Sequence, residues 1–192
     1  LTCDWSSDVC SSDLGVPFVL SNVASTSIED VAAVMGDAPR WFQVYPGKDP
    51  EIIASAIRRA EAAGYSAIVV TLDNPLLGWR VRDLRTGTLP FLRGEGLANY
   101  LSDPVVRARL SRPPEEDREA AIQFVLNVFV NPAFSWDGIA DIRRRTRLPL
   151  LLKGITHPSD ARMAVEYGVD GIVVSNHGGR QVDGAVAALD AL

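Results

Sequence analysis

The sequence predicts an α/β fold in which parallel strands and helices alternate, as in part of a TIM (β/α)₈ barrel. Two observations lead to this prediction. From Gly15 onward, short apolar runs alternate with helical patterns, and each apolar run ends in polar side chains. Continuous apolar strands are typical of parallel sheets covered on both faces. Polar ends on successive strands favour a closed ring, because an open doubly wound sheet places its ligand mainly at one switch point.

The first half of the chain is predicted to contain three strands, with a helix after each of the first two. The first helix has Ser25 or Thr26 as its cap, because a hydroxyl there can accept from free amides of the first turn. The second helix begins at Asp49-Pro50, which supply a capping carboxylate and a proline at the first helical position. The predicted ranges are 16–20, 26–35, 41–45, 49–64 and 67–70.

The same order resumes after a long, proline-rich connection over residues 74–134. A connection of this length in a compact domain is usually functional. We expect one helix within it, at about 116–130, and a further helix opened by His157-Pro158. The remaining predicted ranges are 135–146 (helix), 148–152 (strand), 157–168 (helix), 171–174 (strand) and 184–192 (helix).

Composition narrows the classes of protein and partner. The 192 residues carry a net charge of −5, which argues against nucleic acid or an anionic membrane as the main partner. No apolar run reaches the roughly 18 residues that indicate a membrane span. The two cysteines, Cys3 and Cys10, and the two histidines, His157 and His177, form no metal-ligand pattern. We therefore expect a cytoplasmic protein without a metal site.

Residues 1–14 differ in character from the rest of the chain. Ser-Ser-Asp occurs twice in this stretch, which has neither helical nor strand periodicity. The stretch also resembles translated sequencing adapter. We interpret it as a non-native or disordered segment and assign the barrel domain to residues 15–192.

Polar side chains follow each predicted strand. In three strands they form a pair spaced i, i+2, so that both members point to the same side. Barrel enzymes place their chemistry at this C-terminal rim. The residues at the rim are Ser21, Gln43, Tyr45, Thr71, Asp73, Lys153, Ser175 and His177.

Four segments resemble the FMN-dependent 2-hydroxy-acid oxidases and dehydrogenases. GIVVSNHGGRQVD at 171–183 resembles the active-site signature of that family, and its SNHGGRQ core is highly specific. The other three, in the same order as in the family, are RWFQVY (40–45), TLDNPLLGWRVRDLR (71–85) and LLKGI (151–155). LPFLRGEG at 89–96 is most similar to the lactate 2-monooxygenase branch.

The resemblance implies that the chain holds barrel strands two to six, with the long connection after strand four. It then lacks the first strand and the last two, including the loops that hold the FMN phosphate in the family. As such a fragment, the chain is expected neither to fold stably nor to bind FMN tightly alone.

The resemblance also implies FMN-dependent oxidation of a short 2-hydroxy acid such as lactate to the 2-oxo acid, with or without oxidative decarboxylation. His177 is then the catalytic base, since an imidazole with a pKa of about 6.5 is largely neutral near pH 7. Asp73 orients the imidazole and stabilises the imidazolium. Tyr45 hydrogen-bonds the substrate, whereas Arg80 and Arg180 clamp its carboxylate through bidentate guanidinium contacts.

The cofactor-binding residues implied by the resemblance are Ser21, Gln43, Thr71, Lys153 and Ser175. Lys153 is placed at the N1–C2 carbonyl edge of the flavin, where a cation favours electron acceptance. We expect oxygen as the electron acceptor and a tetramer as the complete protein. Carbanion and hydride mechanisms both remain open, as do the exact substrate and the distinction between oxidase, monooxygenase and dehydrogenase.

Two alternatives compete with this interpretation. Another FMN barrel oxidoreductase, such as an isopentenyl isomerase or a nucleotide dehydrogenase, keeps the fold but lacks the SNHGGRQ residues. A truncated, cofactor-free and inactive product is the alternative from a different class. A complete sequence or a visible flavin spectrum distinguishes them.

Overall fold

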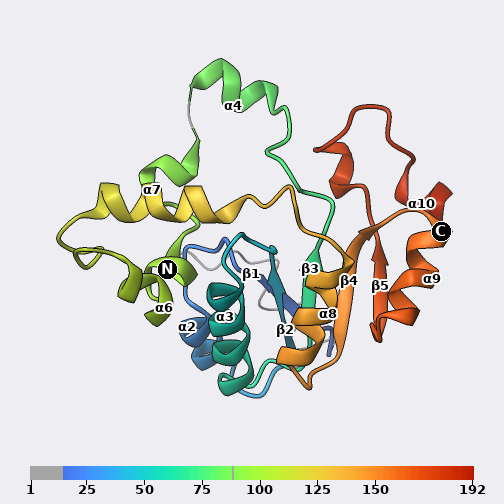
Figure 1. Cartoon of the computed structure of the whole chain (residues 1–192), viewed down its shortest axis with the longest axis horizontal. Coiled ribbons are helices and arrows are strands. Elements are labelled where there is room, and N and C mark those ends of the chain that lie inside the picture. Colours follow the sequence, from blue (N-terminus) through green and yellow to red (C-terminus); the bar gives the residue numbers. More distant parts are fainter. Residues whose placement is uncertain (1–14, 88) are drawn as a thin grey trace.

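The computed structural model describes residues 15–87 and 89–192, which form a five-stranded parallel sheet with helices packed against one of its faces (Figure 1). The strands follow one another in chain order, and each pairs in parallel with the next. A sheet without a reversal of strand order is the wall of a barrel and not a doubly wound sheet. The strands are β1 (Phe18–Ser21), β2 (Arg40–Val44), β3 (Ile68–Thr71), β4 (Leu150–Ile155) and β5 (Gly171–Val174). The predicted partial barrel is confirmed.

Helices connect the strands, and their first residues explain where they begin. The Asp49 carboxylate accepts from the amide of Glu51 at 3.0 Å, and the His157 ring accepts from the amide of Ser159 at 3.2 Å. The predicted cap of the first helix is wrong. The observed cap is Ser27, whose hydroxyl accepts from Asp30 N at 3.1 Å. The helix begins at Ile28, two residues later than expected, because Ile28 is the first residue of the predicted helix whose side chain is buried in the core. The helices between the strands are α2 (Ile28–Met35), α3 (Pro50–Ala62), α8 (Trp136–Arg145) and α9 (Pro158–Glu166), and α10 (Ala188–Ala191) follows β5.

The two faces of the sheet carry different side chains, because neighbouring residues of a strand point to opposite sides. One face packs against the helices and forms the core, together with Ile57 of α3 and Ile139 of α8. In Figure 1, α3 and α8 lie in front of the strands on this side. Its strand residues, each no more than 4% exposed, are Leu20, Phe42, Val44, Ile68, Val70, Leu150, Leu152 and Ile155. The opposite, inner face carries the residues between them.

The long connection is more structured than the sequence predicts. The predicted helix at 116–130 is present as α7, but four shorter helical segments precede it. Residues from this region pack on Ile52 of α3 and form a second apolar cluster with Leu97, Tyr100, Val106, Ile122 and Val125. Helices of four to six residues have no detectable periodicity, and tertiary contacts decide whether they form. The segments are α4 (Val81–Thr86), η1 (Pro90–Arg93), α5 (Ala98–Leu101), α6 (Pro104–Arg109) and α7 (Arg118–Phe129).

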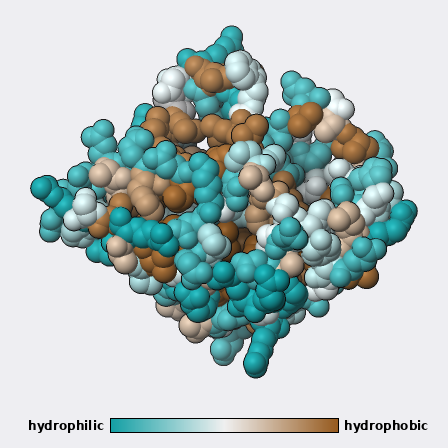
Figure 2. All heavy atoms as spheres, in the orientation of Figure 1, coloured by the Kyte–Doolittle hydropathy of each residue, from teal (hydrophilic) through white to brown (hydrophobic). Residues whose placement is uncertain are grey.

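The segment around α4 projects from the body of the molecule and exposes apolar side chains. Figure 2 shows brown, hydrophobic atoms on this projection, at the top of the view. The exposed large apolar residues in this stretch are Leu76, Leu77, Trp79, Val81 and Leu84. Within the described part of the chain, no helix has the length and apolar character needed to cross a membrane. Cys3 and Cys10, like all of the segment 1–14, lie outside the described residues.

Candidate active site

A cavity of about 550 Å³ lies against the inner face of the sheet and extends to the C-terminal ends of the strands. Its apolar floor includes Val19, Trp41, Val69 and Val173. Its polar lining is Ser21, Gln43, Tyr45, Thr71, Lys153, Ser175 and His177. We call it the rim cavity. It therefore brings together the five residues predicted to bind the cofactor, the predicted substrate tyrosine and the predicted base, and its volume is typical of a small-molecule site.

Asp73, which follows the C-terminal end of β3, contacts both Lys153 and His177. His177 Nδ1 lies 2.7 Å from Asp73 Oδ1, and Lys153 Nζ lies 3.1 Å from Asp73 Oδ2. A carboxylate accepts hydrogen bonds and has no proton to donate, so the proton between His177 and Asp73 belongs on Nδ1. This leaves Nε2 as the ring nitrogen that can accept a proton from a substrate.

The local backbone explains how His177 reaches this position. Among the residues that the structure describes, His177 is the one non-glycine residue with a positive φ, 60°. A side chain with a Cβ keeps this backbone conformation only where surrounding contacts hold it. The His177 amide donates to Ser175 Oγ at 3.0 Å. The Asn176 side chain accepts from the amide of Gly179 at 3.2 Å. These two bonds close the turn after β5 and hold the imidazole over the end of the sheet.

Gly154 makes the approach of Asp73 possible. Its φ is +105°, and a Cβ built there would lie 2.6 Å from Asp73 Cβ and 2.7 Å from Asp73 N. The register of β4 against β5 is also irregular between Lys153 and Ile155. A glycine in this irregularity lets the Asp73 backbone come close enough for its carboxylate to contact both Lys153 and His177.

Tyr45 lies just past the end of β2, with its ring against Phe129 of α7 at 5.3 Å and 70°. Burial raises the pKa of Tyr45, and the Asp73 carboxylate raises it further, whereas Asn74 and Arg80 act in the opposite direction. The phenol therefore remains protonated at neutral pH and can donate a hydrogen bond into the rim cavity.

Ser21 and Gln43 form a second pair in the rim cavity. They are register partners in β1 and β2, and Ser21 Oγ donates to Gln43 Oε1 at 2.7 Å. Gln43 Nε2 is buried and has no partner among the described residues. A buried donor without a partner is costly. The pair therefore offers an N–H group to a ligand atom that accepts hydrogen bonds.

The two predicted carboxylate-binding arginines do not line the rim cavity. Arg80 is half-buried at the start of α4, and Arg180 is exposed after η2 (His177–Gly179). Their loops nevertheless contact each other, since Gln181 Nε2 donates to the Leu76 carbonyl at 2.9 Å. A side chain at Gly78 would collide with the Arg180 carbonyl. The two arginines thus stand on adjoining loops, and their joint role remains a prediction.

The sequence did not predict a role at the site for three residues that contact it. Asn74 and Phe129 flank Tyr45, and Gly154 accommodates Asp73. Gly154 lies inside β4, which extends to Ile155 and thus beyond the predicted strand 148–152, and glycine inside a strand indicates a bulge or a close approach. Phe129 had no such signal, since it reaches Tyr45 only through the packing of α7. Among the described residues, no group of three or more His, Cys, Asp and Glu side chains could hold a metal ion.

Residues 9–192 match the protein-family model described as FMN-dependent dehydrogenase. The chain is 46% identical over 179 residues to an L-lactate oxidase of Lysinibacillus sphaericus, covering 93% of this chain and 46% of that protein. It is 41% identical over 183 residues to 2-hydroxyacid oxidase 1 of Homo sapiens, covering 93% of this chain and 47% of that protein. The chain thus spans just under half the length of these relatives.

Solved structures agree with the sequence relatives. The crystal structure of a mandelate oxidase superposes with a TM-score of 0.76 at 37% identity, covering 97% of this chain and 48% of that one. Another structure of a mandelate oxidase, a variant with a C4a-OH-FMN adduct, matches with a TM-score of 0.72 at 38% identity, over 97% of this chain and 47% of that one. The likeness extends over nearly all the residues of the partial barrel.

Proposed function

Because this chain belongs to the FMN-dependent dehydrogenase family, we propose that it supplies the catalytic rim of an FMN enzyme that oxidises a short 2-hydroxy acid to the 2-oxo acid. The observation that carries the proposal is the contact between Asp73 and His177 at the edge of the rim cavity. We assign residues 15–192 to an incomplete barrel domain, and we propose the activity for a protein that also has the remaining strands of an eight-stranded barrel. We call that protein the full barrel.

The rim cavity suits a flavin. Gln43 Nε2 and the hydroxyls of Thr71 and Ser175 offer hydrogen bonds, and Lys153 contributes a positive charge. The apolar floor suits the flat face of an aromatic ring system. When bound, FMN supplies the two-electron acceptor that amino-acid side chains lack. Ser21, Gln43, Thr71, Lys153 and Ser175 are the residues that we propose hold it.

His177 is the proposed base. The Asp73 carboxylate accepts a hydrogen bond from the protonated Nδ1 of His177, so that the unprotonated Nε2 faces the substrate. When Nε2 accepts a proton, the neighbouring Asp73 carboxylate stabilises the imidazolium. Lys153 contacts the other oxygen of the same carboxylate at 3.1 Å and holds it in this orientation. The chemistry therefore needs all three residues in this arrangement.

The substrate carboxylate is proposed to bind between Arg80 and Arg180. A pair of guanidinium groups can hold a carboxylate in a fixed plane through bidentate hydrogen bonds. Tyr45, with its protonated phenol, is the proposed donor to the hydroxyl or carboxylate of the substrate. Support for this arrangement comes from the contact between the two arginine-bearing loops.

For the substrate and the acceptor, we infer lactate or a similar short 2-hydroxy acid and molecular oxygen, because several relatives are oxidases of lactate or other 2-hydroxy acids. Oxidative decarboxylation is a variant of the same proposal, supported only by the resemblance of residues 89–96 to the lactate 2-monooxygenase branch. A homotetramer is the proposed assembly of the full barrel.

The experiment that tests the proposal is anaerobic mixing of the FMN-loaded full barrel with L-lactate, glycolate and mandelate in parallel. Loss of the visible flavin absorbance with at least one acid is the expected result. Production of the 2-oxo acid in air, measured together with hydrogen peroxide, then separates simple oxidation from decarboxylation. A full barrel that binds FMN but is reduced by none of the three acids would contradict the proposed function.

A further inference from the structure

The short helix α5 holds the end of β1, which is the strand that carries Ser21. Asn99 Nδ2 donates to the carbonyls of Ser21 and Asn22, each at 3.3 Å. The next residue, Tyr100, accepts from Asn22 Nδ2 at 2.7 Å through its hydroxyl. Asn99 and Tyr100 are 3% and 6% exposed, so that water does not compete for these bonds. Asn99 and Tyr100 of the long connection therefore hold Ser21 and Asn22 at the end of β1 through hydrogen bonds.

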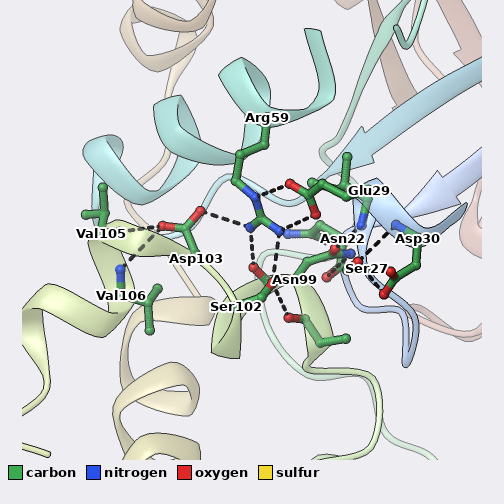
Figure 3. A network of polar contacts seen from close by, with 12 residues as sticks. Asn22, Ser27, Glu29, Asp30, Arg59, Asn99, Ser102, Asp103, Val105 and Val106 are labelled. Carbon is green, nitrogen blue, oxygen red and sulfur yellow. Dashed lines mark hydrogen bonds and ion pairs between the residues drawn. The ribbon is translucent and has the colours of Figure 1, made fainter. Parts of the chain in front are cut away.

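Arg59 of α3 holds α5 in turn (Figure 3). Its Nη1 donates to the Asn99 carbonyl at 2.8 Å and to Asp103 Oδ2 at 3.2 Å. Its other two nitrogens donate to the Glu29 carboxylate of α2, each at 2.8 Å. One guanidinium thus connects α2, α3, α5 and the N-cap residue of α6, and its bond to the Asn99 carbonyl holds α5 next to the end of β1.

Ser21 links these contacts at the end of β1 to the rim cavity. The Ser21 hydroxyl donates a hydrogen bond to Gln43 Oε1, and the buried Gln43 Nε2 is then the end of the amide that is free to bind a ligand. If the Ser21 backbone moved away, Gln43 would lose the partner that sets which end of its amide is free. Contacts that hold the Ser21 backbone therefore help to keep the N–H donor of Gln43 free for a ligand.

We propose that Asn99 is a positioning residue for cofactor binding: through the carbonyls of Ser21 and Asn22, it holds the Ser21–Gln43 pair in the orientation that accepts the cofactor. The proposal rests on the proposed function, because it takes FMN to be the ligand of the rim cavity. Asn99 itself does not line the rim cavity, so its effect on binding is indirect.

The most informative substitution is Asn99→Asp in the full barrel. Asn99 Oδ1 accepts from the amide of Ile28 at 2.8 Å, and a carboxylate preserves this contact at the start of α2. The same carboxylate cannot donate to the two carbonyls and repels them. Tyr100→Phe is a milder second variant, because it removes a single hydroxyl and leaves Asn22 Nδ2 without its acceptor. The matched control is Asn131→Asp, since Asn131 Nδ2 also donates to a loop carbonyl, that of Gly47 at 3.0 Å, and its side chain makes no hydrogen bond to β1 within the described part of the chain.

We expect Asn99→Asp to raise the Kd for FMN, measured by quenching of flavin fluorescence, about tenfold, which corresponds to about one lost hydrogen bond. Tyr100→Phe should raise the Kd several-fold, and Asn131→Asp should leave it within twofold of the parent. At saturating FMN, the KM for the 2-hydroxy acid should be unchanged in Asn99→Asp. A role in stability alone would lower the Tm of Asn99→Asp and leave the Kd at the parental value, and that result would overturn the proposal.

Amide hydrogen exchange separates this inference from the proposed function. In the FMN-free full barrel, Asn99→Asp should speed exchange in residues 21–28, whereas Asn131→Asp should not. If the parent bound no FMN, the proposed function would fail, and unchanged exchange in residues 21–28 would then also overturn the positioning role. Faster exchange there, without any FMN binding by the parent, would support the role of Asn99 in holding the end of β1 and contradict only the identity of the ligand.

Discussion

His177 Nδ1 lies 2.7 Å from Asp73 Oδ1, although the two residues are 104 positions apart in the sequence. Each follows a strand of the same parallel sheet, so their approach is a product of the barrel and not of local sequence. The contact assigns the Nδ1 proton to the side that faces Asp73 and makes Nε2 the available base. The first prediction tests this assignment directly.

Replacing His177 with Ala in the full barrel should leave FMN bound and slow anaerobic flavin reduction by roughly 10²–10⁴-fold, the usual contribution of a positioned base. Asp73→Asn should also slow reduction, because the imidazolium loses its neighbouring negative charge. His157→Ala is the control, since His157 only caps α9: it should reduce stability by about 1 kcal/mol and leave the reduction rate unchanged. Parental reduction by His177→Ala would show the assigned base to be wrong.

Arg80→Lys and Arg180→Lys should each raise the KM for the 2-hydroxy acid by about tenfold or more and lower kcat. Lysine preserves the charge but loses the planar fork that holds a carboxylate through two bonds. Steady-state kinetics at saturating FMN measures both parameters. Arg82→Lys, at an exposed position on α4, is the control and should behave as the parent. If the Arg80 or the Arg180 variant matched this control, that arginine would have no place in the proposed binding of the substrate carboxylate.

Gly154→Ala should lower both stability and the rate of flavin reduction. The added Cβ would meet the Asp73 backbone and side chain within 2.8 Å, at a φ of +105°, so Asp73 must shift, and its contact with His177 is disturbed. Gly168→Ala provides the matched control, because Gly168 has a φ of +70° with nothing within 4 Å of the added atom. The control should lose about 1–2 kcal/mol of stability without a change in flavin reduction. Equal reduction rates in the two variants would contradict the role of Gly154.

Stability should fall as the pH rises above 10, in part because of Tyr65. Burial raises the pKa of Tyr65 to about 12 from its usual value of 10.0. Between these values the unfolded chain releases the phenol proton and the folded chain keeps it, so each pH unit costs up to about 1.4 kcal/mol. Urea unfolding at pH 9, 10 and 11 measures the effect.

Tyr65→Phe provides the comparison for this pH dependence. It should be less stable near neutral pH, because the hydrogen bond of 3.1 Å to the Ile28 carbonyl is lost. Its stability should nevertheless decline less steeply above pH 10 than that of the parent. Parallel declines in the two proteins would show that another group titrates.

Much of the fold was predictable because its elements are strongly patterned. Continuous apolar strands and capped helices indicated five parallel strands, and the structure confirms them in chain order. The short helices of the long connection were not predictable. α5 has four residues and no helical periodicity, and it is held by Arg59 and by apolar contacts to residues distant in sequence.

The sequence by itself determined which residues stand at the rim, because polar side chains at the ends of parallel strands must share one edge of the sheet. Only the tertiary structure decided which of them touch. Gly154 brings Asp73 between Lys153 and His177, and Ser21 occupies one end of the Gln43 amide. The physical reason is that strand periodicity fixes the side to which a side chain points, whereas hydrogen-bond partners depend on ångström-scale distances that bulges, turns and packed helices set.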